Sequence, residues 1–199
     1  SKDNSDTNKE ENEPEIFNGT ETETETKTSG NIRNSDTWEF NAEDGDMYYF
    51  INDITGYRLN VVDAACGSRF YNFEKTKDGG TTWTEVNGDP FDQNMGVAEG
   101  LLFFTNDFGF AGLTYASEDF SMLYVTKDGG ETFERLELPL DTVTELPSES
   151  AELGFTIEDY DYHTMPQIVD GKMEIYLQTD AMEQQGICLL YTSPSPRDA

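Results

Sequence analysis

Short runs of apolar and aromatic residues alternate with polar residues through most of the chain, and Gly-rich turns separate the runs. Two stretches fifty residues apart repeat one order: an apolar run, Asn-Asp, a Gly that opens a second run, a third run, a Gly-Gly turn and a last alternating run. Runs of this length, rich in β-branched and aromatic residues, are typical of strands and too short for most helices. The pattern therefore predicts an all-β protein built from repeated units of four antiparallel strands.

A third unit follows the two repeats, with its landmarks spread further apart. It comes after a Pro-, Ser- and Glu-rich stretch, 139–151, which we interpret as a loop, and it opens with residues 154–159. Its last turn is not completed, because Ser195 stands where the first two units have Asp and no Gly-Gly follows. The predicted strands are 48–53 and 56–62 in the first unit, 101–107 and 109–114 in the second, and 173–178 and 187–193 in the third.

The Gly-Gly turn of the first two units is an eight-residue motif, T-K-D-G-G-x-T followed by an aromatic residue, at 76–83 and again at 126–133. Its glycines allow the positive φ angles that a tight turn requires. The Asp is expected to accept hydrogen bonds from backbone N–H groups one or two residues further on, and the aromatic residue is expected to cover the turn. All these roles are structural. The residues assigned to them are Thr76, Asp78, Gly80, Thr82 and Trp83 in the first copy, and Thr126, Asp128, Gly130, Thr132 and Phe133 in the second.

Both copies match the pattern S/T-x-D-x-G-x-T-W/F, so the chain from about residue 47 to 193 resembles the Asp-box of bacterial neuraminidase (BNR) repeats. Related repeats occur in sialidase-like, sortilin-like and photosystem II assembly factor-like proteins, where the Asp-box joins the two outer strands of a β-propeller blade. The resemblance implies an incomplete β-propeller of about three four-stranded antiparallel blades, at roughly 41–90, 98–138 and 152–193. Because propellers close with typically four to eight blades, we expect this chain to be an arc of a longer ring.

Two segments lie outside the predicted propeller fragment, residues 31–193. Residues 1–30 are acidic and of low complexity, and we interpret them as a disordered tether. This tether resembles the spacer after the lipidated cysteine of bacterial surface lipoproteins, which implies a lipid anchor upstream of residue 1. Residues 194–199 are interpreted as disordered or artefactual, because the tail from Cys188 onward resembles the translation of a sequencing adapter. A genuine proline-rich C-terminus is the alternative.

The segment 37–40 resembles the strand that follows an Asp-box, since it also reads Thr-Trp and then alternates. Two interpretations are open. It is either an outer strand that the N-terminal segment lends to the last blade, which would help to close the ring, or an aromatic strand that packs on the first blade.

The net charge of the chain is −29, from 12 Lys and Arg against 41 Asp and Glu. Residues 1–30 hold nine acids and three lysines, so the remaining −23 belongs to the predicted propeller fragment and the tail. So acidic a body repels nucleic acids and anionic membrane surfaces, and it disfavours anionic substrates such as sialic acid. No run of eighteen apolar residues is present, so no transmembrane segment is predicted. The tether and the family resemblance imply an extracytoplasmic location, either secreted or anchored at the cell surface.

Metal and cofactor sites are not predicted. Cys66 and Cys188 match no metal-binding spacing, although they can pair in an oxidising compartment, and the single histidine, His163, leaves little for a zinc site or a catalytic triad. The oxygen-rich stretches 43–46 and 158–161 lack the spacing of a calcium-binding EF-hand loop. Both Gly-Gly pairs lead into strands and not into a helix, so they are not nucleotide-binding loops.

Two functions remain for the propeller fragment. A glycoside hydrolase needs two carboxylates across the scissile bond, and Asp53, Asp107 and Asp159 are weak catalytic candidates because each is expected to end an inner strand. Turn formation is the alternative role of these residues. The resemblance to sialidases also implies three arginines, one of them in an Arg-Ile-Pro motif that this chain lacks.

A binding module is the favoured hypothesis, with a protein or glycan ligand and with the chain as part of a larger surface lipoprotein. A fragment of a glycoside hydrolase, sialidase-like or specific for neutral glycans, is the alternative. The tyrosines of the stretch 159–162 either stack on sugar rings or fill the space between two blades.

Overall fold

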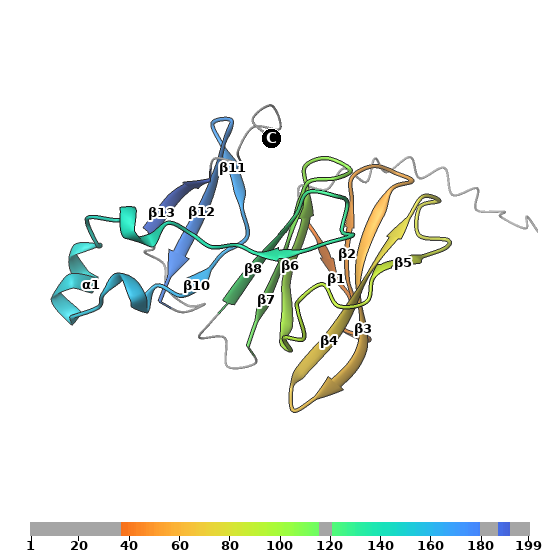
Figure 1. Cartoon of the computed structure of the whole chain (residues 1–199), viewed down its shortest axis with the longest axis horizontal. Coiled ribbons are helices and arrows are strands. Elements are labelled where there is room, and N and C mark those ends of the chain that lie inside the picture. The colour runs from red at the N-terminus through yellow and green to blue at the C-terminus, as the bar shows by residue number, and fades with distance from the viewer. Residues whose placement is uncertain (1–36, 116–120, 180–186, 192–199) are drawn as a thin grey trace, which may run out of the picture. The chain divides into compact units, whose positions relative to one another are not determined.

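The computed structural model describes residues 37–115, 121–179 and 187–191 (Figure 1). These residues form three antiparallel β-sheets with three short helices, so the predicted all-β, antiparallel fold is confirmed. The chain divides into a unit of residues 1–30 and a unit of residues 31–199, and every described residue belongs to the second unit. The predicted tether and the tail at 194–199 lie outside the described residues.

The first sheet contains five strands, each antiparallel to the next, in the order β1-β2-β3-β4-β5. Side chains alternate across it, so that Tyr57 and Leu59 are buried on one face whereas Arg58 lies on the other. β1 pairs with β2, with Glu39 opposite Tyr48. The segment 37–40 therefore supplies an edge strand of the first sheet. This agrees with the second interpretation, a strand that packs on the first unit. The strands are β1 (Glu39–Phe40), β2 (Met47–Phe50), β3 (Gly56–Ala65), β4 (Ser68–Thr76) and β5 (Thr84–Asn87).

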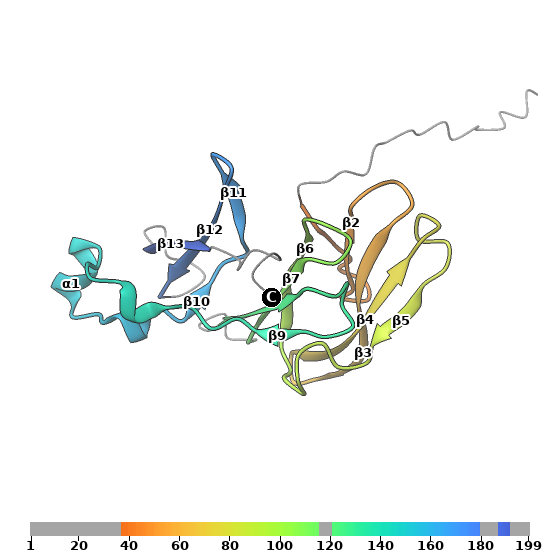
Figure 2. The same ribbon diagram turned by 45° about the horizontal axis from the view of Figure 1, so that its top comes forward.

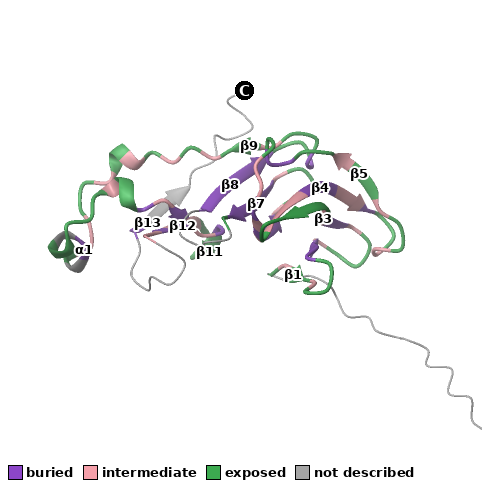
Figure 3. Ribbon diagram, turned by 90° about the horizontal axis from the view of Figure 1, so that it is seen from below, coloured by how far each residue is buried: buried purple, intermediate pink, exposed green. Residues whose placement is uncertain are grey.

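The second sheet has four strands in the order β6-β7-β8-β9 and lies between the other two sheets (Figure 1, Figure 2). Its two central strands are buried along their whole length (Figure 3). A sheet that is covered on both faces needs apolar or small residues at every position, and this explains the continuous apolar runs of this unit. The strands are β6 (Val97–Phe103), β7 (Gly109–Thr114), β8 (Ser121–Thr126) and β9 (Glu134–Arg135).

The third sheet has an interrupted first strand. β10 and β11 both pair with one edge of β12, and β13 pairs with the other edge. Pro166 lies at the interruption and cannot donate a ladder hydrogen bond. Thr164 fills the gap, because its N–H donates to Tyr176 O (2.9 Å) and its Oγ1 accepts from Tyr176 N (3.2 Å). The strands are β10 (Tyr162–His163), β11 (Gln167–Val169), β12 (Lys172–Gln178) and β13 (Ile187–Tyr191).

The stretch 139–151, interpreted as a loop, in fact contains the 3-10 helix η1 (Leu140–Thr142) and the start of α1 (Ser148–Leu153). The Glu, Ala and Leu residues of α1 favour a helix, and the neighbouring Pro and Ser obscured that signal. A tertiary contact also holds it, because the buried Tyr160 donates its hydroxyl proton to Ser150 Oγ at 2.6 Å. No helix among the described residues is long and apolar enough to cross a membrane.

The expectation that Asp159 ends an inner strand is wrong. Asp159 is the last residue of the 3-10 helix η2 (Ile157–Asp159). Its Oδ2 accepts hydrogen bonds from Thr156 N (2.6 Å) and Thr156 Oγ1 (2.9 Å), and the Thr156 side chain accepts in turn from the Asp159 backbone, so the two residues form a capping box. The spacing Thr-x-x-Asp is a local helix-start signal, and it outweighs the apolar residues that suggested a strand.

Aromatic rings fill the space between the first and second sheets. The Tyr57 and Phe103 rings stack with centroids 3.7 Å apart, and the Phe73 ring lies 5.8 Å from that of Phe103. The Tyr57 hydroxyl donates to Asn106 O of the second sheet's first turn at 3.0 Å. All three rings are fully buried, so these contacts form the centre of the core.

Met165 and Ser121 both make contacts between the second and third sheets. Met165 packs against Gly100 and Gly112, where a Cβ atom would come within 2.4 Å and 2.9 Å of its side chain. The Ser121 hydroxyl donates to His163 O (2.9 Å) and accepts from His163 N (2.6 Å). The missing side chains on β6 and β7 therefore make the room that Met165 occupies.

Candidate functional site

Six hydrogen bonds hold the first Gly-Gly turn, residues 76–83, and four of them recur in the second turn, residues 126–133. Thr76 Oγ1 donates to Asp78 Oδ1 (2.7 Å) and accepts from Gly80 N (2.9 Å). Thr82 donates twice to the carboxylate, from its N–H to Oδ1 (2.9 Å) and from its hydroxyl to Oδ2 (2.6 Å). The second turn has the same four bonds, at 2.5–3.0 Å, between the residues Thr126, Asp128, Gly130 and Thr132.

The carboxylate of each box bonds to a backbone N–H four residues further on, and not one or two as expected. Two successive glycines with positive φ, 72° and 90° at Gly79 and Gly80, turn the chain back so that Thr82 meets Asp78. The hydrogen bonds, led by that of the Thr82 hydroxyl, lower the pKa of Asp78 to about 2. Both oxygens of the Asp78 carboxylate accept hydrogen bonds within the turn, which agrees with a structural role for this residue.

The aromatic residues that end the two boxes cover different surfaces. Trp83 packs edge-on against the Tyr48 and Phe50 rings of its own sheet, at 5.7 Å and 6.0 Å. Phe133 instead packs on Phe73 of the first sheet, at 5.1 Å. The second box therefore helps to join two sheets, beyond closing its own hairpin.

The three weak catalytic candidates lie in two turns and in a short helix. Asp107 lies in the β6–β7 turn, where its carbonyl oxygen accepts from Gly129 N of the second box (2.9 Å). Asp53 lies in the matching β2–β3 turn, where the next residue, Ile54, accepts from Gly79 N in the same way (2.9 Å). Asp159 is the last residue of η2 and bonds to its N-cap residue, Thr156, and none of the three candidates lines the pocket described next.

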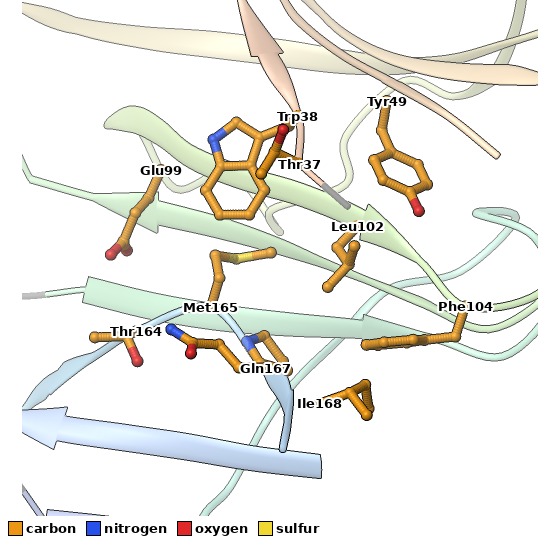
Figure 4. A pocket seen from close by; sticks show the side chains of 11 residues that line it. Thr37, Trp38, Tyr49, Glu99, Leu102, Phe104, Thr164, Met165, Gln167 and Ile168 are labelled. Atoms are coloured by element: carbon orange, nitrogen blue, oxygen red, sulfur yellow. The ribbon is translucent and has the colours of Figure 1, made fainter. Parts of the chain in front are cut away.

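A pocket of about 760 Å³ is lined by residues of β2, of β6 and of the interrupted strand β10–β11 (Figure 4). This volume is within the range of small-molecule sites, about 300 to 1,000 Å³. β2 contributes one side chain, β6 and the turn after it three, the interrupted strand of the third sheet five, and the segment before β1 two. The lining residues are Thr37, Trp38, Tyr49, Glu99, Leu102, Phe104, Thr164, Met165, Pro166, Gln167 and Ile168.

Glu99 reaches this pocket because of a β-bulge. Ala98 lies opposite Leu113 and Gly100 opposite Gly112, so Glu99 is an extra residue of β6 that has no partner on β7. A bulge redirects a side chain relative to the strand's alternation. In the view of Figure 4, Glu99 and Trp38 lie toward one end of the pocket, and Tyr49 and Phe104 toward the other.

The Glu99 carboxyl group is an ionisable group with incomplete hydrogen bonding. The Tyr162 side chain hydrogen-bonds to it, but its Oε2 is buried and has no hydrogen-bond partner among the described residues. Burial raises the pKa of Glu99 from 4.5 to about 7, and the Tyr162 hydrogen bond opposes this shift only in part. Shifts of this kind gather at functional sites, so Glu99 is the leading candidate residue of this chain.

The sequence reasoning missed Glu99, although one signal was present. Glu99 is the single charged residue within the apolar run 97–103, and a lone acid in a predicted core strand needs an explanation. Trp38 and Met165 could not have been found in this way, because only the tertiary arrangement places them beside Glu99.

We expect Glu99→Gln to stabilise the protein at alkaline pH. The folded pKa of Glu99 is raised, so between about pH 4.5 and 7 the unfolded chain binds fewer protons and stability falls as pH rises. A neutral Gln removes this loss, a relative gain on the order of 2 to 3 kcal/mol between pH 4 and pH 8. Urea denaturation of both proteins at the two pH values measures it. Glu134→Gln, which removes the same charge from exposed β9, is the control, and an equal effect of Glu99→Gln at both pH values would contradict the raised pKa.

The other sequence candidates have structural surroundings. Tyr160 and Tyr162 are both buried, so they fill the space between elements and do not form an exposed sugar-stacking surface. Within the acidic stretch 43–46, the Asp46 carboxylate accepts from Val61 N at 2.8 Å. No group of three His, Cys, Asp or Glu able to hold a metal ion occurs in the described part of the chain.

The remaining single residues are placed as follows. Cys66 is exposed at the β3–β4 turn and forms no disulfide there, and Cys188 lies in β13 with a side chain outside the described set. His163 lies in β10, and burial lowers the pKa of its imidazole.

The chain was compared with protein-family models, with curated proteins and with solved structures, and no match was found in any of the three comparisons.

Proposed function

We propose that this chain is an arc of a BNR-like β-propeller and serves as an extracytoplasmic binding module within a larger surface lipoprotein. The two Asp-box turns support the propeller assignment. Each joins the last two strands of its sheet, β4 to β5 and β8 to β9. The same four hydrogen bonds occur in both turns. The succession of three antiparallel sheets, with β2, β6 and the interrupted strand β10–β11 all reaching one pocket, also fits blades around an axis.

The observation that carries the binding function is the pocket itself. It combines aromatic and aliphatic walls with one carboxyl group of altered pKa, and this is the usual composition of a ligand site. The ligand is a protein or a glycan, as expected for a surface module.

A glycoside hydrolase is the second candidate, and Glu99 is the specific observation in its favour. A carboxyl group with a pKa of about 7 is suited to act as a general acid at neutral pH. However, Glu99 is the only acidic residue among the described residues that line the pocket, and none of those residues is an arginine. Hydrolysis needs a second carboxylate, or a tyrosine nucleophile with an arginine cluster in sialidases, so binding is favoured.

The two tryptophans of the chain allow a direct test of the binding site. We expect a ligand from a panel of peptides and neutral oligosaccharides to shift the indole N–H signal of Trp38, which lines the pocket, and not that of Trp83, which packs on its own sheet. Trp38→Leu should weaken this binding at least about tenfold, since buried aromatic contacts dominate such sites. NMR titration measures both effects.

Two results would overturn this proposal. One is a ligand that shifts Trp83 but leaves Trp38 unchanged. The other is turnover of neutral or sialylated aryl-glycosides that is lost in Glu99→Gln, which would favour the hydrolase.

A further inference from the structure

The chemical character of the pocket is uneven. Aliphatic side chains, including Leu102, Met165 and Ile168, form much of its wall, and Glu99 is the acid among its described lining residues. No described lining residue is basic. A ligand that fits this arrangement has an apolar body and one polar group that suits an acidic partner.

The polar group must satisfy a buried carboxyl oxygen. Oε2 of Glu99 lacks a hydrogen-bond donor among the described residues, and an ionised carboxylate without a partner is costly to bury. A neutral hydroxyl group would supply one hydrogen bond and no charge. An ammonium group supplies three N–H donors and the opposite charge, so it removes both costs.

The charge of the whole chain favours the same class of ligand. A net charge of −29 creates a negative potential that raises the local concentration of cations and repels anions. The aromatic ring of Trp38 in the same pocket adds to this preference, because aromatic faces attract cations.

The apolar wall distinguishes between cations. An amino sugar presents hydroxyl groups on every side, and they would lose their water against Leu102, Met165 and Ile168 without replacement. A lysine side chain has a four-carbon apolar stem and a single ammonium group at its end. Its stem matches the aliphatic wall and its head matches the acid.

We propose that this pocket binds a lysine side chain of a protein partner, with the ammonium group at the Glu99 carboxylate and the stem along the wall of Leu102 and Met165. The inference rests on the proposed binding function and specifies its ligand. It predicts proton release, because the ammonium group favours the ionised form of Glu99. Around neutral pH the carboxyl is partly protonated, and Tyr162 on β10 is the titratable neighbour that acts on it.

Calorimetric titration of the chain with the blocked amino acid Nα-acetyl-lysine methylamide tests this proposal. The matched probe is the norleucine analogue, which keeps the four-carbon stem and lacks the ammonium group. We expect the lysine probe to bind at least about tenfold more tightly than the norleucine probe, a typical value for an ion pair shielded from water. Binding should weaken about tenfold from pH 8 to pH 6, as Glu99 becomes protonated, and the measured heat should depend on the ionisation enthalpy of the buffer.

Variants separate the pocket from general charge attraction. Glu99→Gln should remove the preference for lysine over norleucine and the proton release, whereas Glu134→Gln removes the same charge from β9 and should change neither. An unchanged melting temperature at pH 4, where Glu99 is protonated in the folded and mostly in the unfolded chain, shows that Glu99→Gln is folded.

The failure of this inference can be distinguished from the failure of the proposed function. Glucosamine or a neutral oligosaccharide that binds at Trp38 while the lysine probe does not would overturn the lysine proposal and leave the binding function intact. Equal binding of the lysine and norleucine probes would also overturn it. If no probe of any class shifts the Trp38 signal, both proposals are wrong.

Discussion

Replacing Gly130 by alanine will destabilise the fold by about 2 to 5 kcal/mol. The left-handed backbone conformation contributes about 1 to 2 kcal/mol of this cost, and overpacking contributes about 1 to 3 kcal/mol. Gly130 has a φ of 94°, and a Cβ atom built there would lie 1.9 Å from Cε1 of the Phe73 ring. That ring is fully buried and packed against Phe103 and Phe133, so it cannot move aside freely.

Gly171→Ala is the matched control for this prediction. Gly171 also has a positive φ, 76°, but nothing lies within 4 Å of its added Cβ atom. It should cost about 1 to 2 kcal/mol, from the backbone alone. Urea denaturation of the two variants measures the difference. If both lose the same stability, the close contact between the second Gly-Gly turn and the first sheet is not formed in solution.

Phe103→Ala will destabilise the protein by about 3 to 5 kcal/mol, the usual cost of removing a buried phenyl ring. Its ring is stacked on Tyr57 at a centroid distance of 3.7 Å and faces Phe73 at 5.8 Å. Removing it leaves a cavity between two sheets that cannot collapse easily, because neighbouring strands hold the other two rings at fixed positions.

Phe40→Ala makes the same chemical change at an exposed site. Phe40 lies on the edge strand β1 with 48% of its surface exposed. We expect a cost within about 0.5 kcal/mol for this variant, measured by the same urea denaturation. A loss of stability in Phe103→Ala as small as that in Phe40→Ala would contradict the aromatic core between the first two sheets.

The equivalent glycines of the two turns, Gly80 and Gly130, differ in what surrounds them. Both copies of the turn need glycines for their backbone conformation, because the two glycines in each copy have positive φ angles. At Gly130 the absent side chain also admits the Phe73 ring of another sheet. At Gly80 the nearest rings are those of Phe50 and Trp83, and each lies 3.4 Å from an added Cβ atom. Alanine at this position would therefore make a van der Waals contact and no severe clash.

Local patterns were enough to predict the antiparallel β-structure. Period-two alternation, runs of strand length and the Gly-Gly turns with their Asp and Thr residues identified the hairpins around both boxes, because each of these signals acts over a few neighbouring residues. Local signals that compete gave errors. The capping interaction between Thr156 and Asp159 turned a predicted strand end into η2, and α1 formed within a predicted loop.

The candidate site could not be derived in the same way. Trp38, Glu99 and Met165 are more than sixty residues apart in sequence, and they share one pocket only because the three sheets pack against one another. The bulge that redirects Glu99 depends on its pairing with β7, and the raised pKa of Glu99 depends on burial by elements far along the chain. Hydrogen bonds within a turn are set by neighbouring residues, whereas burial and charge at a site depend on all the elements that pack around it.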